Sequence, residues 1–319
     1  MPNTEQPLIP LAAITWVGDG LKRPECVLTT AKGELFAGDH HSGIAEVGKP
    51  KRDIAGAPPG FLPNGVAMTK NREFLIANLG PGGGVWRLDR DWRLFPHLFE
   101  ADGELLRVCN FVGVDPAGTE WISVSTRAFP RELAMRPLHA DGFIVRRDAK
   151  GAHIVADGLG FTNECRVDPT GKWVYVNETS GKRISRFAIK GSKLGRRETV
   201  HEFGAGEFPD GFAFDCEGGV WVACVCSNRV VRIETSGQRT LIVDGAEPAK
   251  VAEGEAFFQA DKGGRHHVEV GVTSPLKNIA SVAFGGPDLK TVYLGNLAGS
   301  GIPSFKSPIA GAEPVQWRF

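Results

Sequence analysis

The sequence predicts an all-β protein, a six-bladed β-propeller with a central channel. Two observations support this fold class. Glycine and proline, 41 and 21 of the 319 residues, are spread along the whole chain without a fixed period, as in turn-rich all-β proteins. More specifically, one pattern of a polar residue, an apolar strand, a tight turn and a second apolar strand recurs six times in the same phase.

The composition excludes several other classes of protein. Hydrophobic residues make up 42% and charged residues 23% of the chain, which is the balance of a globular rather than a disordered protein. Lys plus Arg and Asp plus Glu are equal at 37 each, so we expect neither nucleic acid nor a membrane as a partner. The apolar run 11–17 is too short for a secretory signal or a membrane span. We therefore expect a cytoplasmic protein whose six cysteines are free and buried.

Three copies of the repeat align without gaps. They begin at Asn110, Asn163 and Asp210, and each of these lead residues is followed after five positions by Asp and after eight by Gly. An apolar strand that contains Trp comes next. Asp caps a tight turn with its side chain and Gly tolerates a positive φ, so each copy predicts a β-hairpin.

Three weaker copies share this phase and begin at Glu25, Asn64 and Ser281. Further strand-like runs bring most units to about 40–50 residues, a length typical of a four-stranded propeller blade. Six units therefore predict six blades in one domain, residues 1–319. An N-terminal strand within residues 9–17 is one way to complete the last blade.

Two units are enlarged by insertions near 126–139 and 246–278. The second insertion contains a predicted helix, Lys250 to Lys262, followed by His266-His267, which is a candidate to project from a lid. Long loops in compact domains often form functional lids, but they also decorate blade edges or mediate oligomer contacts. The sequence leaves this choice, and the oligomeric state, open.

The lead residues define a candidate site. Because equal phase in a radial repeat means an equal place in space, these side chains should ring one mouth of the channel if their strands are innermost. All six carry oxygen: Glu25, Asn64, Asn110, Asn163, Asp210 and Ser281. Residues about fourteen positions further on should lie behind the ring: Asp39, Asn78, Asn177 and Cys224.

This set of oxygens predicts a metal site. Carboxylate and amide oxygens suit hard cations, so we expect one divalent cation, Ca²⁺ before Mg²⁺, Mn²⁺ or Zn²⁺. The alternative is that Asn or Asp before Gly simply begins a strand as a turn residue. That alternative fits Asn64 and Asp210, which precede glycines, but not Glu25 and Asn110, which precede Cys26 and Phe111.

Four motifs surround the proposed ligands: Pro-Glu25, Asn110-x-x-x-x-Asp115-Pro-x-Gly118, Asn163, and Pro-Asp210-Gly-Phe-Ala-Phe-Asp215 with its Val-Trp-Val-Ala strand. In these motifs the chain resembles the gluconolactonase / senescence-marker-protein / luciferin-regenerating-enzyme family over about residues 18–300. The resemblance implies a six-bladed propeller with one catalytic divalent cation, usually calcium. It implies Glu25, Asn110, Asn163 and Asp210 as the ligands. It also implies lactone hydrolysis as the commonest activity, with organophosphate cleavage in close relatives.

Departures from the family pattern suggest the substrate. Many members have Asn-Asp where this chain has Asn110-Phe111, and Asn-Gly where it has Asn163-Glu164. Sugar lactonases often carry Arg two residues before the first Asn, where Val108 stands here, with Arg107 one position further back. We therefore expect a hydrophobic or aromatic lactone rather than a simple sugar lactone. The candidate substrate-binding residues are Asn64, Phe111, Arg107 and His41.

The expected chemistry is metal-assisted hydrolysis with Asp210 and Asn110 as catalytic residues. The cation would polarise the lactone carbonyl, and Asp210 would act as general base toward water. No G-x-S-x-G, H-E-x-x-H or Walker motif offers a different mechanism. Two alternatives stay open: a metal-dependent hydrolase or lyase acting on another ester or carbonyl compound, and a propeller that binds a partner without catalysis.

Overall fold

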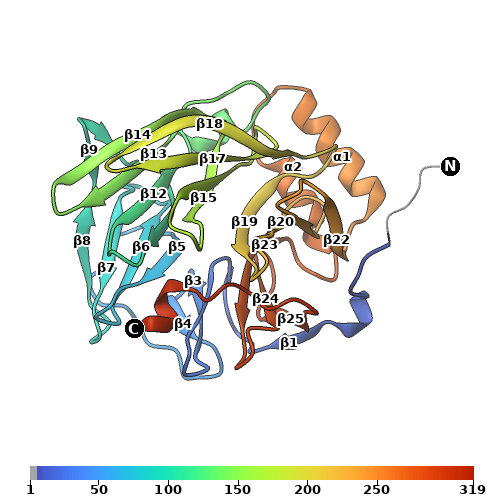
Figure 1. Ribbon diagram of the computed structural model, residues 1–319, viewed down its shortest axis with the longest axis horizontal. Helices are drawn as coiled ribbons and strands as arrows, with labels where there is room; N and C mark the ends of the chain where they lie inside the picture. Colours follow the sequence, from blue (N-terminus) through green and yellow to red (C-terminus); the bar gives the residue numbers. More distant parts are fainter. Residues whose placement is uncertain (1–5) are drawn as a thin grey trace.

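The computed structural model describes residues 6–319, whose strands form six small sheets around a central axis (Figure 1). Five sheets have four strands, one has three, and a separate two-stranded ribbon precedes the third sheet. The predicted six-bladed propeller is confirmed. Residues 1–5 of the predicted domain lie outside the described residues.

The first three blades follow one another along the chain. Blade one consists of β2 (Val27–Thr29), β3 (Leu35–Asp39) and β4 (Gly43–Glu46). Blade two consists of β5 (Pro63–Met68), β6 (Phe74–Asn78), β7 (Val85–Leu88) and β8 (Leu94–Leu98). The ribbon is β9 (Glu100–Ala101) and β10 (Glu104–Leu105), and blade three consists of β11 (Cys109–Val114), β12 (Glu120–Val124), β13 (Gly142–Asp148) and β14 (Gly151–Leu159).

The other three blades complete the circle. Blade four consists of β15 (Thr162–Val167), β16 (Trp173–Glu178), β17 (Arg183–Lys190) and β18 (Lys193–Glu202). Blade five consists of β19 (Pro209–Phe214), β20 (Val220–Cys224), β21 (Arg229–Ile233) and β22 (Arg239–Asp244). Blade six consists of β23 (Ile279–Gly285), β24 (Thr291–Asn296), β25 (Ile302–Lys306) and β1 (Thr15–Val17).

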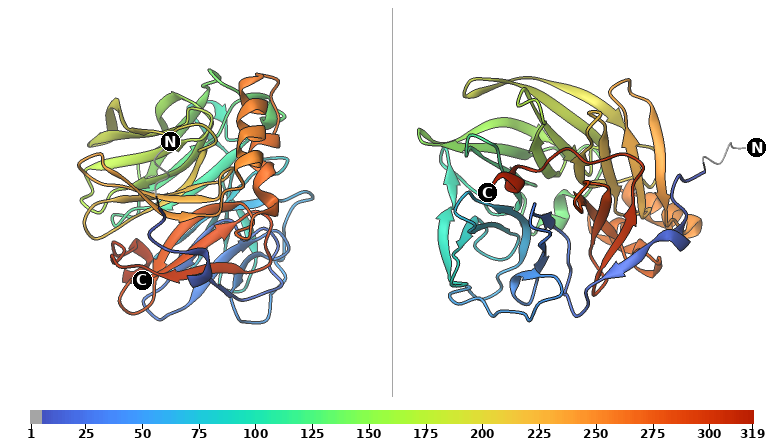
Figure 2. Two further views of the ribbon diagram at one scale, coloured as in Figure 1. Left: turned by 90° about the vertical axis from the view of Figure 1, so that its right-hand side faces the viewer. Right: turned by 60° about the horizontal axis from the view of Figure 1, so that its bottom comes forward.

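The last blade is closed by the N-terminal strand. β1 pairs antiparallel with β25, with Trp16 opposite Pro303. The predicted strand within residues 9–17 is therefore confirmed, although it covers only three of those residues. This pairing joins the two ends of the described chain and closes the ring of blades (Figure 2).

Blade one departs from the expected four strands. After β4 the chain runs through residues 47–62 with one parallel bridge, Ala55 to Arg93. Pro50, Pro58 and Pro59 lie in this segment. Proline has no amide hydrogen for a strand ladder, so a regular fourth strand does not form there.

The predicted hairpin phase holds in all six blades. The residue eight positions after each lead residue has a positive φ of 54–84°: Gly33, Arg72, Gly118, Gly171, Gly218 and Leu289. Its amide donates to the carbonyl three residues earlier in every case. The two non-glycine members show that the weaker copies of the repeat are structurally equivalent to the strong ones.

Apolar side chains fill the space between neighbouring blades. Trp221 of blade five meets Phe284 of blade six with ring centroids 5.2 Å apart, and Phe36 meets Phe74 across the first pair of blades at the same distance. Each fully buried large apolar side chain stabilises the fold by about 1.5–3 kcal/mol. The first strands β2, β5, β11, β15, β19 and β23 contact one another around the axis and are the innermost strands.

The two insertions carry short helices. The first contains a 3₁₀ helix, Arg131–Ala134. The second contains α1 (Pro248–Gln259), which confirms most of the predicted helix, then α2 (His266–Glu269) and a 3₁₀ helix, Val270–Thr273. α1 and α2 lie on one face of the propeller, and the C-terminal segment crosses the other (Figure 2).

Further 3₁₀ helices are Leu11–Ala13 and Val315–Arg318. Within residues 6–319, no helix has the length and apolar character needed to cross a membrane. All six cysteines are free, and five are buried. Cys216 is exposed, contrary to expectation, because it lies in the turn between β19 and β20.

Candidate metal centre at one mouth of the channel

The six lead side chains lie together at the start of the innermost strands. Their exposed fractions are only 2–8%. Hydrogen bonds connect neighbours around the axis: Asn64 Nδ2 donates to the Asn110 carbonyl at 2.9 Å, and Ser281 Oγ donates to the Glu25 carbonyl at 2.5 Å. We call the six residues the oxygen ring.

Irregular strand pairing helps to place the oxygen ring. In β5, β11, β15, β19 and β23 the register with the second strand of the blade shifts at or next to the lead residue. A bulge of this kind breaks the strict alternation of a strand and re-aims side chains. It allows two consecutive residues, Asn163 and Glu164, to be buried together.

The residues predicted to lie behind the oxygen ring stand at or next to the ends of second strands of their blades. Asp39, Asn78, Asn177 and Cys224 are all fully buried. Asn177 Nδ2 donates to the Asp210 carbonyl at 2.8 Å. Thr179 Oγ1 donates to the Pro209 carbonyl at 2.7 Å and accepts from Asn163 Nδ2 at 3.1 Å. These bonds fix the backbone that carries Asp210.

The oxygen ring contains buried oxygens that accept no hydrogen bond from the described residues. They are Asn64 Oδ1, Asn163 Oδ1 and Glu25 Oε2. The last of these lies 2.7 Å from Arg23 Nη2 as an ion pair. A buried polar atom without a hydrogen bond costs about 1–3 kcal/mol, so such atoms call for an explanation. A hard cation held by the ring would satisfy Asn163 Oδ1 and Glu25 Oε2, which belong to the predicted ligands, and would leave Asn64 Oδ1 to accept a hydrogen bond from a substrate.

The buried carboxylates of the site also favour a bound cation. Burial raises the pKa of Asp210 well above its usual range, and the nearby Glu25 and Glu164 carboxylates raise it further, while Arg23 and Asn163 oppose the shift. Mutual repulsion of buried carboxylates is relieved by a cation. Among residues 6–319 no group of three or more His, Cys, Asp or Glu is arranged to hold a metal, as expected where only two ring members are carboxylates. The residues present therefore fit an oxygen-ligated cation.

The other predicted site residues lie elsewhere. Phe111 is buried and lines a cavity further along the channel, where the Arg166 guanidinium lies 4.6 Å from its ring centroid. Arg107 is exposed. His41 is exposed and borders a surface pocket of about 290 Å³. Of the four predicted substrate-binding residues, the structure brings only Asn64 into the oxygen ring.

Two further ionisable residues lie near the ring and are not among the predicted site residues. His40, rather than His41, lies close to Arg23 and Glu25, and burial followed by the Arg23 charge lowers its pKa to about 4. Arg131 of the first insertion is also near these two residues: the Arg23 charge lowers its pKa and the Glu25 charge raises it. The proximity of Arg23 to Glu25 in sequence was a usable signal, whereas nothing in the sequence placed Arg131 near the ring.

An ion pair divides the channel below the oxygen ring. Arg166 Nη2 lies 2.8 Å from Glu164 Oε2, which also accepts a hydrogen bond from the Phe212 amide at 3.2 Å. A Cβ on Gly211 would lie 2.7 Å from Glu164 Oε1 and 2.6 Å from the Ala280 carbonyl. Glycine is therefore required in the Pro-Asp-Gly motif because the carboxylate and a neighbouring backbone approach so closely.

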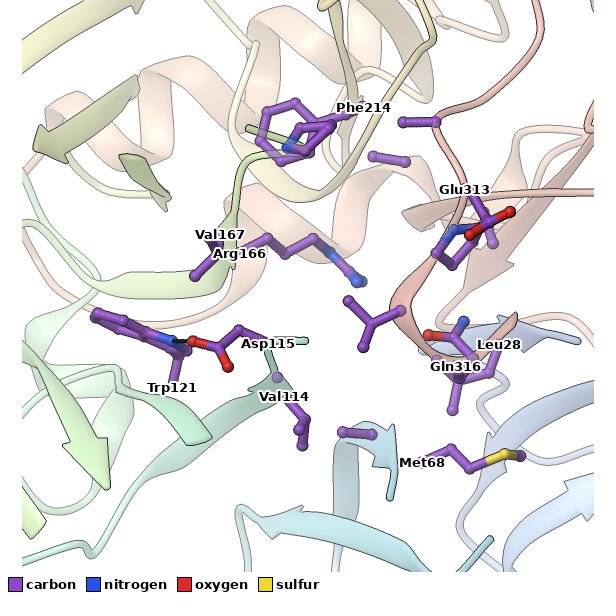
Figure 3. A pocket seen from close by; sticks show the side chains of 18 of the residues that line it. Leu28, Met68, Val114, Asp115, Trp121, Arg166, Val167, Phe214, Glu313 and Gln316 are labelled. Carbon is purple, nitrogen blue, oxygen red and sulfur yellow. Dashed lines mark hydrogen bonds between the residues drawn. The ribbon is translucent and has the colours of Figure 1, made fainter. Parts of the chain in front are cut away.

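Beyond this pair lies a cavity of about 360 Å³, the far cavity (Figure 3). Its walls are mainly apolar residues of the first hairpins, and none of the oxygen-ring residues lines it. Arg166 reaches in from one side, with Leu28 and Gln316 opposite. The C-terminal segment covers the cavity: Gln316 Nε2 donates to the Thr29 carbonyl at 3.2 Å, and Trp317 Nε1 to Thr29 Oγ1 at 3.0 Å.

Fold and site together define a class of six-bladed propellers whose channel mouth is ringed by carboxylate and amide oxygens. The chain belongs to the SMP-30/gluconolactonase/LRE-like family, whose model matches residues 31–252. This confirms the resemblance seen in the motifs. The matched region contains Asn64, Asn110, Asn163 and Asp210, while Glu25 and Ser281 lie outside it.

Among curated relatives, a 6-deoxy-6-sulfogluconolactonase from Pseudomonas putida is 28% identical over 216 residues, 66% of this chain and 62% of that protein. The adipocyte plasma membrane-associated protein Hemomucin of Drosophila melanogaster is 25% identical over 228 residues, 64% of this chain and 38% of its own length. The chain thus spans less than two thirds of the length of either relative.

Solved structures show the same fold. A luciferin-regenerating enzyme superposes with a TM-score of 0.68 at 15% identity and covers 95% of this chain and 99% of its own. A calcium-binding regucalcin from Agrobacterium tumefaciens superposes with a TM-score of 0.62 at 16% identity and covers 98% and 100%. The chain therefore has the same propeller fold as these two proteins over nearly its whole length.

Proposed function

We propose that this protein is a divalent-metal-dependent hydrolase that opens a lactone. The observation that carries the proposal is the oxygen ring, in which Asn64, Asn163 and Glu25 keep buried oxygens without hydrogen bonds beside Asp210. Membership of the SMP-30/gluconolactonase family supports the reaction class, and the name of the Pseudomonas relative, a sulfogluconolactonase, supports a lactone as substrate.

The metal ligands in this proposal are Glu25, Asn110, Asn163 and Asp210. Ca²⁺ is the cation we expect, because all four supply hard oxygen atoms and the regucalcin neighbour is described as a calcium-binding protein. Mg²⁺, Mn²⁺ and Zn²⁺ are the alternatives. When bound, the cation supplies Lewis-acid polarisation of the lactone carbonyl.

The protein's own residues supply the proton transfer. Asp210 takes a proton from the attacking water, whose oxygen forms a bond to the carbonyl carbon. Burial and the neighbouring carboxylates raise the pKa of Asp210, which makes its carboxylate a stronger base toward water. The ester bond between that carbon and the endocyclic oxygen of the lactone then breaks. The proton held by Asp210 passes to the departing alkoxide. Asn110 orients the reacting groups, and Asn177 and Thr179 hold the Asp210 backbone in place.

The expectation of a hydrophobic or aromatic lactone depended on Phe111 and Val108 facing the mouth. Phe111 lines the far cavity rather than the oxygen ring, and Val108 is buried. An aromatic lactone remains a prediction to be measured. We also propose that residues 1–319 act as one cytoplasmic domain.

The test is a metal add-back assay. The protein is stripped with a chelator, and Ca²⁺, Mg²⁺, Mn²⁺ and Zn²⁺ are restored singly with a panel of aliphatic, sugar and aromatic lactones. We expect hydrolysis that requires a cation, together with cation binding by calorimetry. Cation binding without opening of any lactone would instead favour another ester or a carbonyl compound as substrate. Absence of cation binding would favour a non-catalytic binding propeller.

A further inference from the structure

The two insertions meet on the same face as the oxygen ring. The first follows the second strand of blade three, and the other links blade five to blade six, so both leave the propeller at the end where the inner strands begin. They are joined to each other, because the Gly264 amide donates to the Glu132 carbonyl at 2.8 Å. Arg136 and Asp261 lie 3.8 Å apart across the same junction.

Each insertion brings an arginine to this junction. Arg131 precedes Glu132 and Arg265 follows Gly264, so the hydrogen bond between the insertions also brings these two residues near each other. Within residues 6–319, Arg131 donates no hydrogen bond, and its ion-pair contact is a long one, 3.5 Å from Nε to Glu132 Oε1. Arg265 uses only Nε, which lies 2.9 Å from Glu269 Oε1.

A third arginine belongs to the mouth itself. Arg23 pairs with Glu25 through Nη2 at 2.7 Å, and its buried Nε has no hydrogen-bond partner among the described residues. Its φ of 54° places the side chain from a left-handed turn directly before the oxygen ring. The side chains of Arg23, Arg131 and Arg265 are only 16–18% exposed.

The charges of Arg265 and Arg23 both act on Arg131. Burial, then the charges of Arg265 and Arg23, lower the pKa of Arg131 to about 10, while Glu25 opposes the shift. Arg131 is still charged at neutral pH. The three arginines therefore make few contacts with carboxylates: Arg23 pairs with Glu25, and Arg131 and Arg265 each contact one carboxylate through Nε alone, Glu132 and Glu269, which are 36% and 57% exposed.

Concentrated guanidinium donors of this kind match an oxyanion. Arginine presents planar pairs of N–H groups that bind carboxylate, phosphate or sulfonate oxygens bidentately. We propose that Arg131 and Arg265, with Arg23 beside the oxygen ring, bind an anionic group of the substrate. The substrate is then a lactone with a carboxylate, phosphate or sulfonate on a substituent remote from its carbonyl. This inference rests on the proposed function.

The first test compares a neutral lactone with its anionic counterpart, D-glucono-1,5-lactone and its 6-phosphate, in the Ca²⁺-loaded protein. We expect a higher kcat/KM for the phosphate. Arg131→Gln should lower kcat/KM for the phosphate about 10- to 100-fold, the effect of losing one charged hydrogen-bonded contact. It should leave the value for the neutral lactone within about threefold.

The matched control is Arg136→Gln, which removes the same charge from the same insertion but at the contact with Asp261. It should leave both substrates unchanged. Arg131→Lys keeps the charge without the planar pair of donors and should fall between wild type and Arg131→Gln. Because this variant preserves the charge, it remains informative if Arg131→Gln fails to fold. Equal losses for both lactones in Arg131→Gln would overturn the inference.

A binding measurement separates this inference from the proposed function. Calorimetry compares 6-phosphogluconate with gluconate, the open-chain products, on the wild type and Arg131→Gln. We expect tighter binding of the phosphate and loss of that preference in the variant. If no lactone is opened but this preference is present, the anion site stands and the lactonase proposal fails. If lactones are opened without any preference for the phosphate in turnover or binding, the anion site fails and the lactonase proposal stands.

Discussion

The two ends of the channel are built from the same six strands yet have opposite characters. At one end, the oxygen ring gathers two carboxylates and three amides, and Arg131 of the first insertion lies close to Glu25. At the other end, six regular hairpin turns surround an apolar cavity that the C-terminal segment covers. The two ends differ in the strand pairing of the inner strands, which is irregular at the ring end and regular toward the cavity.

Local backbone geometry explains the contrast. At the ring end, shifts in strand register free the lead residues from the alternation of the strand. Toward the far end the pairing is regular, so alternate small and branched residues such as Val112 and Val282 face their neighbours. The Glu164–Arg166 pair marks the boundary between the two halves. The irregular backbone thus lies at the proposed catalytic end, and the regular backbone lies where apolar side chains pack.

The strongest test of this contrast is Asp210→Asn, which removes one charge at constant shape. We expect kcat/KM for lactone opening to fall by about 10³-fold or more, because the general base is lost. Cation affinity should fall as well, since one of two charged ligands is gone. The measurements are steady-state kinetics and calcium titration. Asp288→Asn, an exposed turn aspartate on the far face, is the control and should behave as wild type. Full activity in Asp210→Asn would remove the ring from the mechanism.

The boundary between the halves is tested by Arg166→Met. The change leaves the buried Glu164 carboxylate without its cation, so we expect the free energy of unfolding to fall by about 3 kcal/mol. Urea unfolding measures this. The double variant Glu164→Gln with Arg166→Met removes both charges and should recover most of the loss. If the double variant is as unstable as the single one, the ion pair is not what the structure depends on there.

Acid sensitivity of the ring face is tested at His267. Burial and then Arg265 lower its pKa to about 4, so the neutral imidazole is favoured in the folded protein. In the unfolded chain the pKa is about 6.5, and the unfolded state therefore binds more protons between these values. This contribution is complete above pH 6.5 and is lost toward pH 4, by about 3 kcal/mol in all.

The variant His267→Leu keeps an uncharged side chain among Phe208, Phe257 and Phe258. Its free energy of unfolding should change less with pH between 6.5 and 4 than that of the wild type. His153→Gln, an exposed histidine paired with Asp102, is the control. An unchanged slope in His267→Leu would contradict the assignment.

The smallest effect is expected at the far cavity. Val167→Phe adds bulk to its lining at a half-buried position. If the substrate binds at the oxygen ring, kcat/KM should stay within about twofold of wild type. A tenfold or greater loss, with an unchanged melting temperature, would place the substrate in the far cavity and reverse the comparison between the two ends.

The fold and the oxygen ring were accessible from sequence because both depend on a repeated phase. The phase located all six lead residues, and even Arg72 and Leu289 take the left-handed conformation that glycine has in the strong copies. The prolines of residues 47–62 could also have predicted that blade one lacks a regular fourth strand. The repeat phase therefore predicts where each hairpin turn lies, even where another residue replaces the glycine of the strong copies.

The surroundings of the ring could not be predicted in the same way. Phe111 follows Asn110 directly, but the register shift at this point sends it to the far cavity rather than toward the ring face. Arg131 and Arg265 belong to insertions without repeat counterparts, so only tertiary contacts bring them together. Glu164 and Arg166 were visible as opposite charges two apart on an inner strand, a signal that sequence reasoning overlooked.

The closure of blade six has a consequence for synthesis. β1 is made at the beginning of the described chain, but its partner β25 lies nearly three hundred residues later. During translation the first strand has no edge to join until the last blade has left the ribosome. The circle of blades is therefore completed last, by a contact of very large sequence separation, which is the slowest kind to form. The oxygen ring spans this same seam, where Glu25 meets Ser281, so the complete site exists only once the chain has closed.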